Sequence, residues 1–239
     1  HPPAAAALQK TEKFRANEAL LEKYQSAVEA PAVMKIVARV DRWKRARPEA
    51  KDPAKAETFC QRGLEEFRQG KFLEAIENWS MAILLDQTRS DILSNIGFAW
   101  LQLEQWDRAE LALADALILD VNNLEAWLNL GSSRLSQGDP EGAGRFFDQC
   151  LLIDQKSESV WKAKGRAFAQ LGKMHESEIC FGKAEELSPE SSEIKVDLAI
   201  LYAHSDRKAD AEKKIQEALG CIPRDPRALI LRDQLASLA

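Results

Sequence analysis

Apolar and polar positions alternate along most of the chain with the spacing of an amphipathic helix. Leu93, Ile96, Trp100 and Leu103 recur at intervals of three or four residues, which places them on one face of a helix. Stretches of this kind follow one another in pairs with a short turn between them, and no stretch is a convincing strand. The pattern therefore predicts an all-α chain of short helices.

The helical pattern repeats every 34 residues without insertions. A small residue marks the first helix at Gly63, Gly97, Gly131, Gly165 and Ala199. A small residue in the second helix follows at Ala75, Ala109, Ala143, Ser177 and Ala211, and a large apolar residue at Trp79, Leu113, Phe147, Phe181 and Ile215. A period of this length indicates stacked helix pairs, none of which can bury its apolar face alone.

The small residues are expected to set the distance between the two helices of a pair. Antiparallel helices approach closely only where facing side chains are small, as for Gly131 opposite Ala143. We expect the large residues to fill the gaps between one pair and the next. The turns fall at equivalent positions, Gly70, Glu104, Gly138, Gly172 and Asp206. In the third unit, Asp139 is expected to cap the second helix and Pro140 to occupy its first turn.

These units resemble the tetratricopeptide repeat, whose pattern is W-x2-L-G-x2-Y, then A, F and P. The third unit matches its opening at Trp127, Leu130 and Gly131. The fourth unit matches at Trp161, Gly165, Phe168, Ala184 and Pro189, and the fifth at Leu198, Tyr202, Ala211, Ala218 and Pro223. Three positions depart from the pattern and put local packing in question: Glu66 and Arg134 in place of an aromatic residue, and Lys195 in place of the first Trp.

The resemblance implies a right-handed α-solenoid of stacked antiparallel helix pairs. Its five repeats would span residues 56–89, 90–123, 124–157, 158–191 and 192–225. Residues 1–55 would form a basic N-terminal helical extension and linker. Residues 226–239 begin like a sixth unit and stop after one helix, as expected of a C-terminal capping helix.

Charge divides the chain into a basic front and an acidic body. Residues 1–55 hold 12 Lys or Arg and 7 Asp or Glu, whereas the remainder holds 21 and 31. A stripe of Val33, Ile36, Val37, Val40 and Trp43 lies opposite Lys35, Arg39, Arg42 and Lys44. We expect this helix to cover the first repeat near Phe59 and Phe67. The alternative is a docking element for an acidic partner or an anionic membrane surface.

The residues that carry chemistry in enzymes are missing from recognisable patterns. The four cysteines have no metal-ligand spacing, and His1, His175 and His204 build no zinc site. We therefore expect no enzyme activity, no cofactor and no metal, and the acidic body disfavours a nucleic acid partner. Unpaired cysteines favour a reducing compartment, the cytoplasm or an organelle matrix or stroma. The chain starts at His1, so a removed presequence, anchor or tag stays an alternative.

The resemblance also implies a concave groove lined by the first helix of each repeat. Its lining would include Asp91, Asn95 and Phe98 in the second unit, Leu128, Asn129 and Ser132 in the third, and Lys162 and Arg166 in the fourth. Asn95 and Asn129 share one repeat position, where carboxamides could clamp the backbone of an extended peptide, as in some long arrays of the family. The alternative is two solvated asparagines. The family's carboxylate clamp for a chaperone tail is disfavoured, because Cys60 and Leu64 stand where Lys and Asn belong.

These features predict a non-catalytic scaffold or assembly factor that holds a peptide segment or helix of a partner protein in its groove. The alternative is a constitutive structural subunit of a larger complex that uses its outer surface and its basic N-terminal arm.

Overall fold

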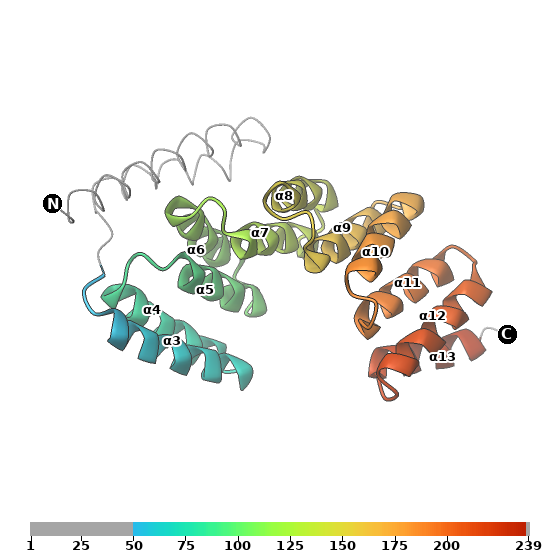
Figure 1. The fold of residues 1–239 in the computed structure, drawn as a ribbon, viewed down its shortest axis with the longest axis horizontal. Helices are drawn as coiled ribbons and strands as arrows, with labels where there is room; N and C mark the ends of the chain where they lie inside the picture. The colour runs from blue at the N-terminus through green and yellow to red at the C-terminus, as the bar shows by residue number, and fades with distance from the viewer. Residues whose placement is uncertain (1–49, 238–239) are drawn as a thin grey trace. The chain divides into compact units, whose positions relative to one another are not determined.

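The computed structural model describes residues 50–237 and is entirely helical over that range apart from turns and one isolated β-bridge. The helices are α3 (Pro53–Arg68), α4 (Phe72–Leu85), α5 (Ser90–Gln102), α6 (Trp106–Leu119), α7 (Leu124–Ser136), α8 (Pro140–Ile153), α9 (Glu158–Gln170), α10 (Met174–Leu187), α11 (Ser192–His204), α12 (Lys208–Cys221) and α13 (Pro226–Ser237). They form two compact parts that divide between Ser133 and Arg134 (Figure 1). The all-α fold class is confirmed.

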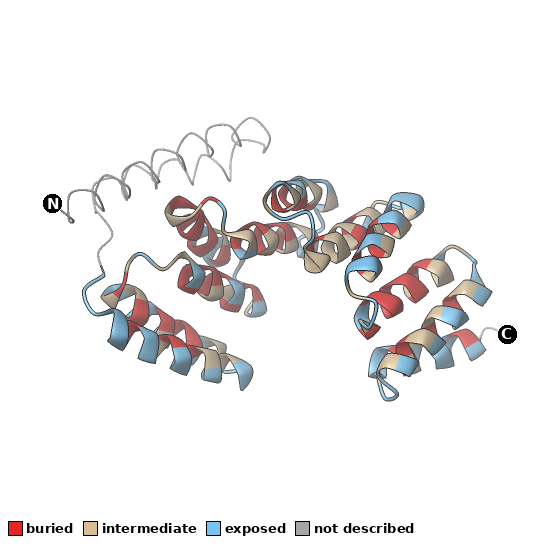
Figure 2. Ribbon diagram, in the orientation of Figure 1, coloured by how far each residue is buried: buried red, intermediate tan, exposed pale blue. Residues whose placement is uncertain are grey.

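Helix pairing follows the repeats that the sequence predicts. Helices α3 and α4, α5 and α6, α9 and α10, and α11 and α12 pack against each other more extensively than against helices of neighbouring repeats. Buried residues concentrate on the faces where paired helices meet, and exposed residues line the opposite sides (Figure 2). The handedness of the whole stack stays a prediction.

The predicted turn inside each repeat adopts a left-handed backbone. The φ angles are 76°, 78° and 71° at Gly70, Gly138 and Gly172. Glu104 and Asp206 adopt φ angles of 55° and 56° at the equivalent positions, although a side chain disfavours this region. The turn geometry is therefore common to all five repeats, and two of them hold it at a conformational cost.

The capping residues predicted for α8 are confirmed. Asp139 accepts a hydrogen bond from the backbone N–H of Gly142 at 2.8 Å, and Pro140 occupies the first turn. The first helix begins in the same way: Asp52 accepts from the N–H of Lys55 at 3.0 Å and Pro53 follows. This start lies three residues before the expected first residue of the repeats, Ala56.

The repeat glycines lie where the two helices of a pair approach most closely. A Cβ atom at Gly97 would lie 2.5 Å from Cγ of Leu113, and one at Gly165 would lie 2.8 Å from the Phe181 ring. A Cβ at Gly63 would lie 2.5 Å from the Trp79 indole. The large residue therefore fills the space left by the glycine of its own repeat.

This finding extends the expected role of the large residues. Phe181 does reach the next repeat, because it shares a core cluster with Ile194 and Leu198 of α11. The expectation that these residues fill only the gaps between pairs was nevertheless incomplete. On the small-residue side, the buried hydroxyl of Ser177 donates to the carbonyl oxygen of Gly165 at 2.8 Å, which ties α10 to α9.

The first tryptophan of the repeat anchors the preceding loop. The indole N–H of Trp127 donates to the carbonyl of Val121 at 2.8 Å, and that of Trp161 donates to the carbonyl of Gln155 at 2.9 Å. Lys195 replaces this tryptophan in the fifth repeat, and its ammonium donates to the carbonyl of Pro189, again six residues earlier. The departure from the family pattern therefore keeps the hydrogen bond while it changes the side chain.

The ends of the repeat region are closed differently. Residues 50–52 lie against the end of α4, where the N–H groups of Lys51 and Asp52 donate to the carbonyl of Leu85. At the other end α13 packs against α12 and α11, with Leu235 in a cluster with Ala199 and Ile215. This position agrees with the predicted capping helix. The predicted N-terminal helices and their apolar stripe lie outside the described residues.

Candidate functional site

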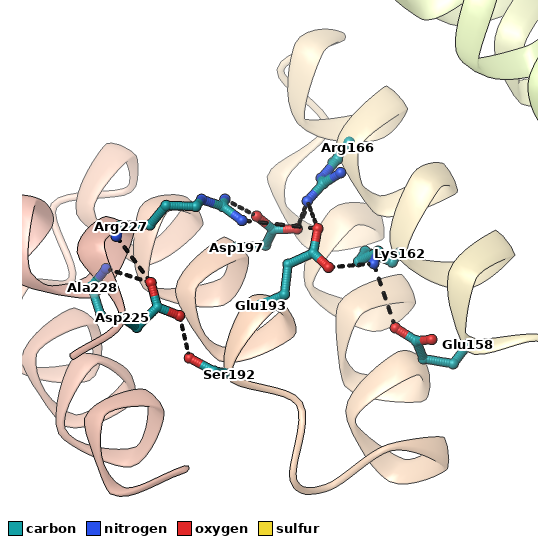
Figure 3. Close-up of polar contacts among 9 residues, drawn as sticks. All are labelled: Glu158, Lys162, Arg166, Ser192, Glu193, Asp197, Asp225, Arg227 and Ala228. Carbon is teal, nitrogen blue, oxygen red and sulfur yellow. Dashed lines mark hydrogen bonds and ion pairs between the residues drawn. The ribbon is translucent and has the colours of Figure 1, made fainter. Parts of the chain in front are cut away.

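The first helix of each repeat carries the predicted groove residues. We number positions from the first residue of each repeat, so that Asp91 occupies position 2 of the second repeat. Their geometry is most completely defined in α9, α11 and α13 (Figure 3). Lys162, at position 5, donates to the Glu193 carboxylate of the next first helix at 2.8 Å. Arg166, at position 9, donates to Glu193 and to Asp197, each at 2.8 Å. The predicted residues Lys162 and Arg166 therefore bind carboxylates of their own chain.

Asp197 lies at the centre of this network. Its side chain is only 5% exposed and lies between the guanidinium groups of Arg166 and Arg227, each with a nitrogen 2.6 Å from a carboxylate oxygen. Figure 3 shows the two arginines approaching it from α9 and α13. A carboxylate this buried needs such partners, because an unpaired buried charge is strongly destabilising. The network therefore links three successive first helices through charge-assisted hydrogen bonds.

Electrostatics within the network favour its charged form. Burial raises the pKa of Glu193, but the hydrogen bonds from Lys162 and Arg166 outweigh it and hold the pKa at about 2. Burial lowers the pKa of Arg166, and the neighbouring Asp197 and Glu193 carboxylates more than reverse that effect. The three cations and the carboxylates of Glu158, Glu193 and Asp197 balance in number. This face of α9 to α13 is polar but carries no net charge in the network.

The corresponding face of α3 and α5 has one bridging arginine. Arg89 donates to both oxygens of the predicted groove residue Asp91, at 2.8 and 2.7 Å, and to Glu57 at 3.0 Å. Glu57 and Asp91 both occupy position 2 of their repeats. Burial raises the pKa of Asp91, but the hydrogen bond and charge of Arg89 lower it further than burial raises it. Asp91 is thus ionised and already paired within the chain.

The two predicted asparagines have unused hydrogen-bonding capacity. The carboxamides of Asn95 and Asn129 make no hydrogen bond to any residue of the described range, although Asn129 is only 9% exposed. A carboxamide offers two donors and an acceptor, and buried polar groups are normally satisfied. These two side chains are therefore available to an external backbone.

The remaining predicted residues surround the asparagines. Phe98 is 38% exposed, and its ring centroid lies 5.4 Å from that of Phe67 in a tilted contact. Leu128 and Ser132 of α7 are half-buried. In the second part, Arg166 at position 9 of α9 contacts Asp197 at position 6 of α11. Asp197 in turn contacts Arg227 at position 2 of α13. If α5 and α7 keep the same register, we expect Phe98 next to Asn129 and Asn95 next to Glu125.

Sequence reasoning missed the partners that neutralise the predicted groove. It named Lys162 and Arg166 but not their carboxylate partners Glu193 and Asp197. It also did not name Arg227, which binds Asp197 from the other side. A signal was available: these three residues occupy positions 2 and 6 of their units, the same positions as Asp91 and Asn95. Arg89 has no counterpart among the predicted lining positions, because it lies in the loop that precedes α5.

A separate cleft lies on the other side of the second part, among α8, α9 and α10. It has a volume of about 590 Å³ and is lined by Asp148, Leu151, Leu152, Gln155, Trp161, Lys183, Glu186 and Leu187. Lys183 lies over the Trp161 ring at 4.7 Å, and Lys164 pairs with Asp148 at 2.5 Å. Leu152 is 67% exposed. The cleft is lined by apolar and polar side chains together, and none of the predicted site residues is among them.

Metal-binding and membrane-spanning features are also lacking in the part of the chain that the structure describes. Among residues 50–237 no group of three or more His, Cys, Asp or Glu is placed to hold a metal ion. Over the same residues, no helix combines the length and apolar character needed to cross a bilayer. Cys60, Cys150 and Cys180 are buried, and burial raises the pKa of the Cys60 and Cys180 thiols.

Comparison with curated proteins finds relatives that are members of a large assembly. The BBSome complex member BBS4 of Bos taurus is 29% identical over 106 residues, which cover 44% of this chain and 20% of that protein. The Xenopus tropicalis BBS4 is 28% identical over 109 residues, covering 46% and 21%. The match thus spans about a fifth of the length of these relatives.

Comparison with solved structures shows the same fold at low identity. A thermophilic TPR protein of Thermus thermophilus superposes with a TM-score of 0.67 at 19% identity, covering 76% of this chain and 97% of that one. Cut9–Hcn1 of the APC/C gives a TM-score of 0.68 at 16% identity, covering 96% and 47%. YrrB, a TPR protein with an unusual peptide-binding site, gives a TM-score of 0.54 at 15% identity, covering 83% and 97%.

A family profile provides the assignment by sequence. The profile described as tetratricopeptide repeat matches residues 99–157 and 162–226, together more than half of the chain. The helix pairs, the left-handed turns and the glycine contacts above are the structural counterparts of that match. The chain belongs to the tetratricopeptide repeat family.

Proposed function

We propose that this protein is a non-catalytic scaffold that holds an extended peptide segment of a partner protein on the face of α5 and α7. The observation that carries the proposal is the pair of carboxamides at Asn95 and Asn129, which occupy one repeat position and have no partner among residues 50–237. Each can accept from a peptide N–H and donate to a peptide carbonyl, so together they hold a backbone without regard to its side chains.

The rest of that face suits a peptide as well. Phe98 and Leu128 offer apolar contact beside the carboxamides, and Phe98 is held on its inner side by the Phe67 ring. By contrast, the equivalent face of α9 to α13 is filled by its own ion pairs. The binding face proposed here is therefore the part formed by α5 and α7, and Lys162 and Arg166 serve mainly to join repeats.

Photo-crosslinking tests this proposal even while the partner is unidentified. Phe98 is replaced by p-benzoylphenylalanine, which keeps an aromatic ring, and Leu152, an exposed apolar residue of α8, is replaced in a matched control. We expect a discrete crosslinked partner from position 98 that is lost when Asn95 and Asn129 are both changed to alanine. Equal crosslinking from position 152, or crosslinking that survives the double change, would contradict the proposal.

A second candidate function is that of a constitutive subunit of a larger complex. It is supported by the similarity to BBS4, a BBSome complex member, and to the APC/C protein Cut9. Purification of the endogenous protein at native concentration separates the two. A stable assembly of fixed composition that persists with the Asn95 and Asn129 variants would favour the subunit role over the peptide-binding role.

A further inference from the structure

We propose that the peptide bound on the face of α5 and α7 carries a lysine or arginine, which pairs with Glu125 beside Asn95. This inference rests on the proposed function and adds the chemistry of the partner. It starts from the carboxylates at position 2 of the first three repeats, Glu57, Asp91 and Glu125.

The first two of these carboxylates show which group such a pair binds. Arg89 bridges them, with nitrogens 3.0 Å from Glu57 and 2.7 Å from Asp91. Arg89 occupies the last position of its repeat, directly before α5. A guanidinium with two carboxylate partners is the strongest form of this hydrogen bond. The geometry between α3 and α5 is therefore that of a cation site filled from within the chain.

The next pair, Asp91 and Glu125, has no bridging cation among residues 50–237. The residue 34 positions after Arg89 is Asn123, which is neutral and accepts a hydrogen bond from the N–H of Ala126 at 2.9 Å as the cap of α7. Glu125 is exposed and has no ion-pair partner among the described residues. A positively charged side chain of a ligand would thus take the place that Arg89 takes one repeat earlier.

A second feature indicates a ligand at this position. Asn129 is nine-tenths buried and has no hydrogen-bond partner in the described range. From the register of α9 to α13, where Asp197 contacts Arg227, we infer that Asn95 lies next to Glu125 and Asn129 next to Phe98. A peptide held by both carboxamides therefore passes within reach of the Glu125 carboxylate. Its cation meets an acid that no other part of the described chain neutralises.

The test uses the full chain and three fluorescein-labelled probes, Lys-Ser-Ser, Gln-Ser-Ser and Glu-Ser-Ser repeats of equal length, followed by fluorescence anisotropy at low salt. We expect the order Lys, Gln, Glu from tightest to weakest. Glu125→Gln should reduce the Lys-over-Gln preference by about 1.4-fold to fivefold, the range typical of exposed ion pairs. Glu125→Lys should reverse the order of the Lys and Glu probes.

Asn123 provides a matched pair of variants. Asn123→Arg introduces the arginine of the preceding repeat and should abolish the preference for the Lys probe, because the new guanidinium binds Glu125 within the chain. Asn123→Ser introduces the residue that stands at the same position before α9 and α11, Ser157 and Ser191, and should leave the preference unchanged. Loss of the preference in both variants would assign the effect to capping and overturn the inference.

The possible results also separate this inference from the proposed function. If the Lys and Gln probes bind equally and the Asn95/Asn129 double alanine variant weakens both, the inference is wrong and the peptide-binding face stands. If no probe binds at low salt, the inference is overturned, and the proposed function is judged by the crosslink from position 98. A tighter Glu probe would identify an acidic partner and also overturn the inference.

Discussion

Replacing Gly165 with alanine should destabilise the fourth repeat, because the added methyl group has no room. Its Cβ would lie 2.8 Å from two carbons of the Phe181 ring, and that ring is 2% exposed. The ring cannot move aside freely, since it packs with Ile194 and Leu198 of α11. The hydrogen bond from Ser177 to the Gly165 carbonyl holds the two helices at this distance.

The expected size of the effect follows from two opposing contributions. Overpacking a core costs about 1–3 kcal/mol, and alanine gains about 0.5–1 kcal/mol over glycine inside a helix. The net loss of unfolding free energy should therefore be about 0–2.5 kcal/mol, with a midpoint of about 1 kcal/mol. Gly182→Ala in α10 is a matched control, because a Cβ there meets nothing within 4 Å. It should gain about 0.5–1 kcal/mol.

Urea unfolding followed by far-ultraviolet circular dichroism measures the two variants. Hydrogen exchange of α9 and α10 localises the change, because damage in a repeat protein spreads chiefly to its neighbours. If Gly165→Ala unfolds at the same urea concentration as Gly182→Ala, the helices do not cross closely at this glycine. Close helix crossing would then no longer explain the 34-residue spacing of small residues.

Three further predictions follow from the structure. Glu104→Gly and Asp206→Gly should each raise the free energy of unfolding by about 1 kcal/mol, because glycine adopts the left-handed backbone without strain. Gly172→Ala should lower it by a similar amount, since the added methyl group meets no neighbour and only the backbone is strained. Urea unfolding measures all three variants. Lys195→Met should cost about 1 kcal/mol in the same assay by removing the hydrogen bond to Pro189, whereas Lys195→Trp should keep it. Because the pKa of Glu193 falls from 4.5 to about 2 on folding, its stabilisation is complete above pH 4.5 and is lost as the pH drops toward 2. The wild-type urea midpoint should fall more than that of Glu193→Gln over this interval, and parallel curves would contradict the ion-pair account.

The fold could be predicted from the sequence because each of its rules is local and repeated five times. The left-handed turns at Gly70, Gly138 and Gly172 follow from glycine alone, and the shared spacing carried the same geometry to Glu104 and Asp206. Spacing could not reveal that Phe181 packs under Gly165 as well as against the next repeat. That contact depends on how deeply two helices interpenetrate, which a pattern of small and large residues does not specify.

The resemblance to the family named Asn95, Asn129, Lys162 and Arg166 as groove residues, and their role in binding stays a prediction. The sequence did not reveal the charge pairing around them. It did not show that the carboxylate of Asp197 is buried between two arginines. Burial of a charge depends on partners from three separate helices, and such partners become visible only when the helices are stacked. The N-terminal arm remains a prediction, because it lies outside the described residues.

The most direct test of the central claim is the affinity of the crosslinked partner segment, synthesised as a peptide, for three forms of the full chain. The account predicts that the Asn95/Asn129 double alanine variant binds roughly thirtyfold more weakly than wild type, from a loss of about 1 kcal/mol for each carboxamide. Asn122→Ala, at an exposed loop position close to α7, should bind as wild type does. Unchanged affinity in a correctly folded double variant would contradict the claim and return both asparagines to ordinary solvated residues.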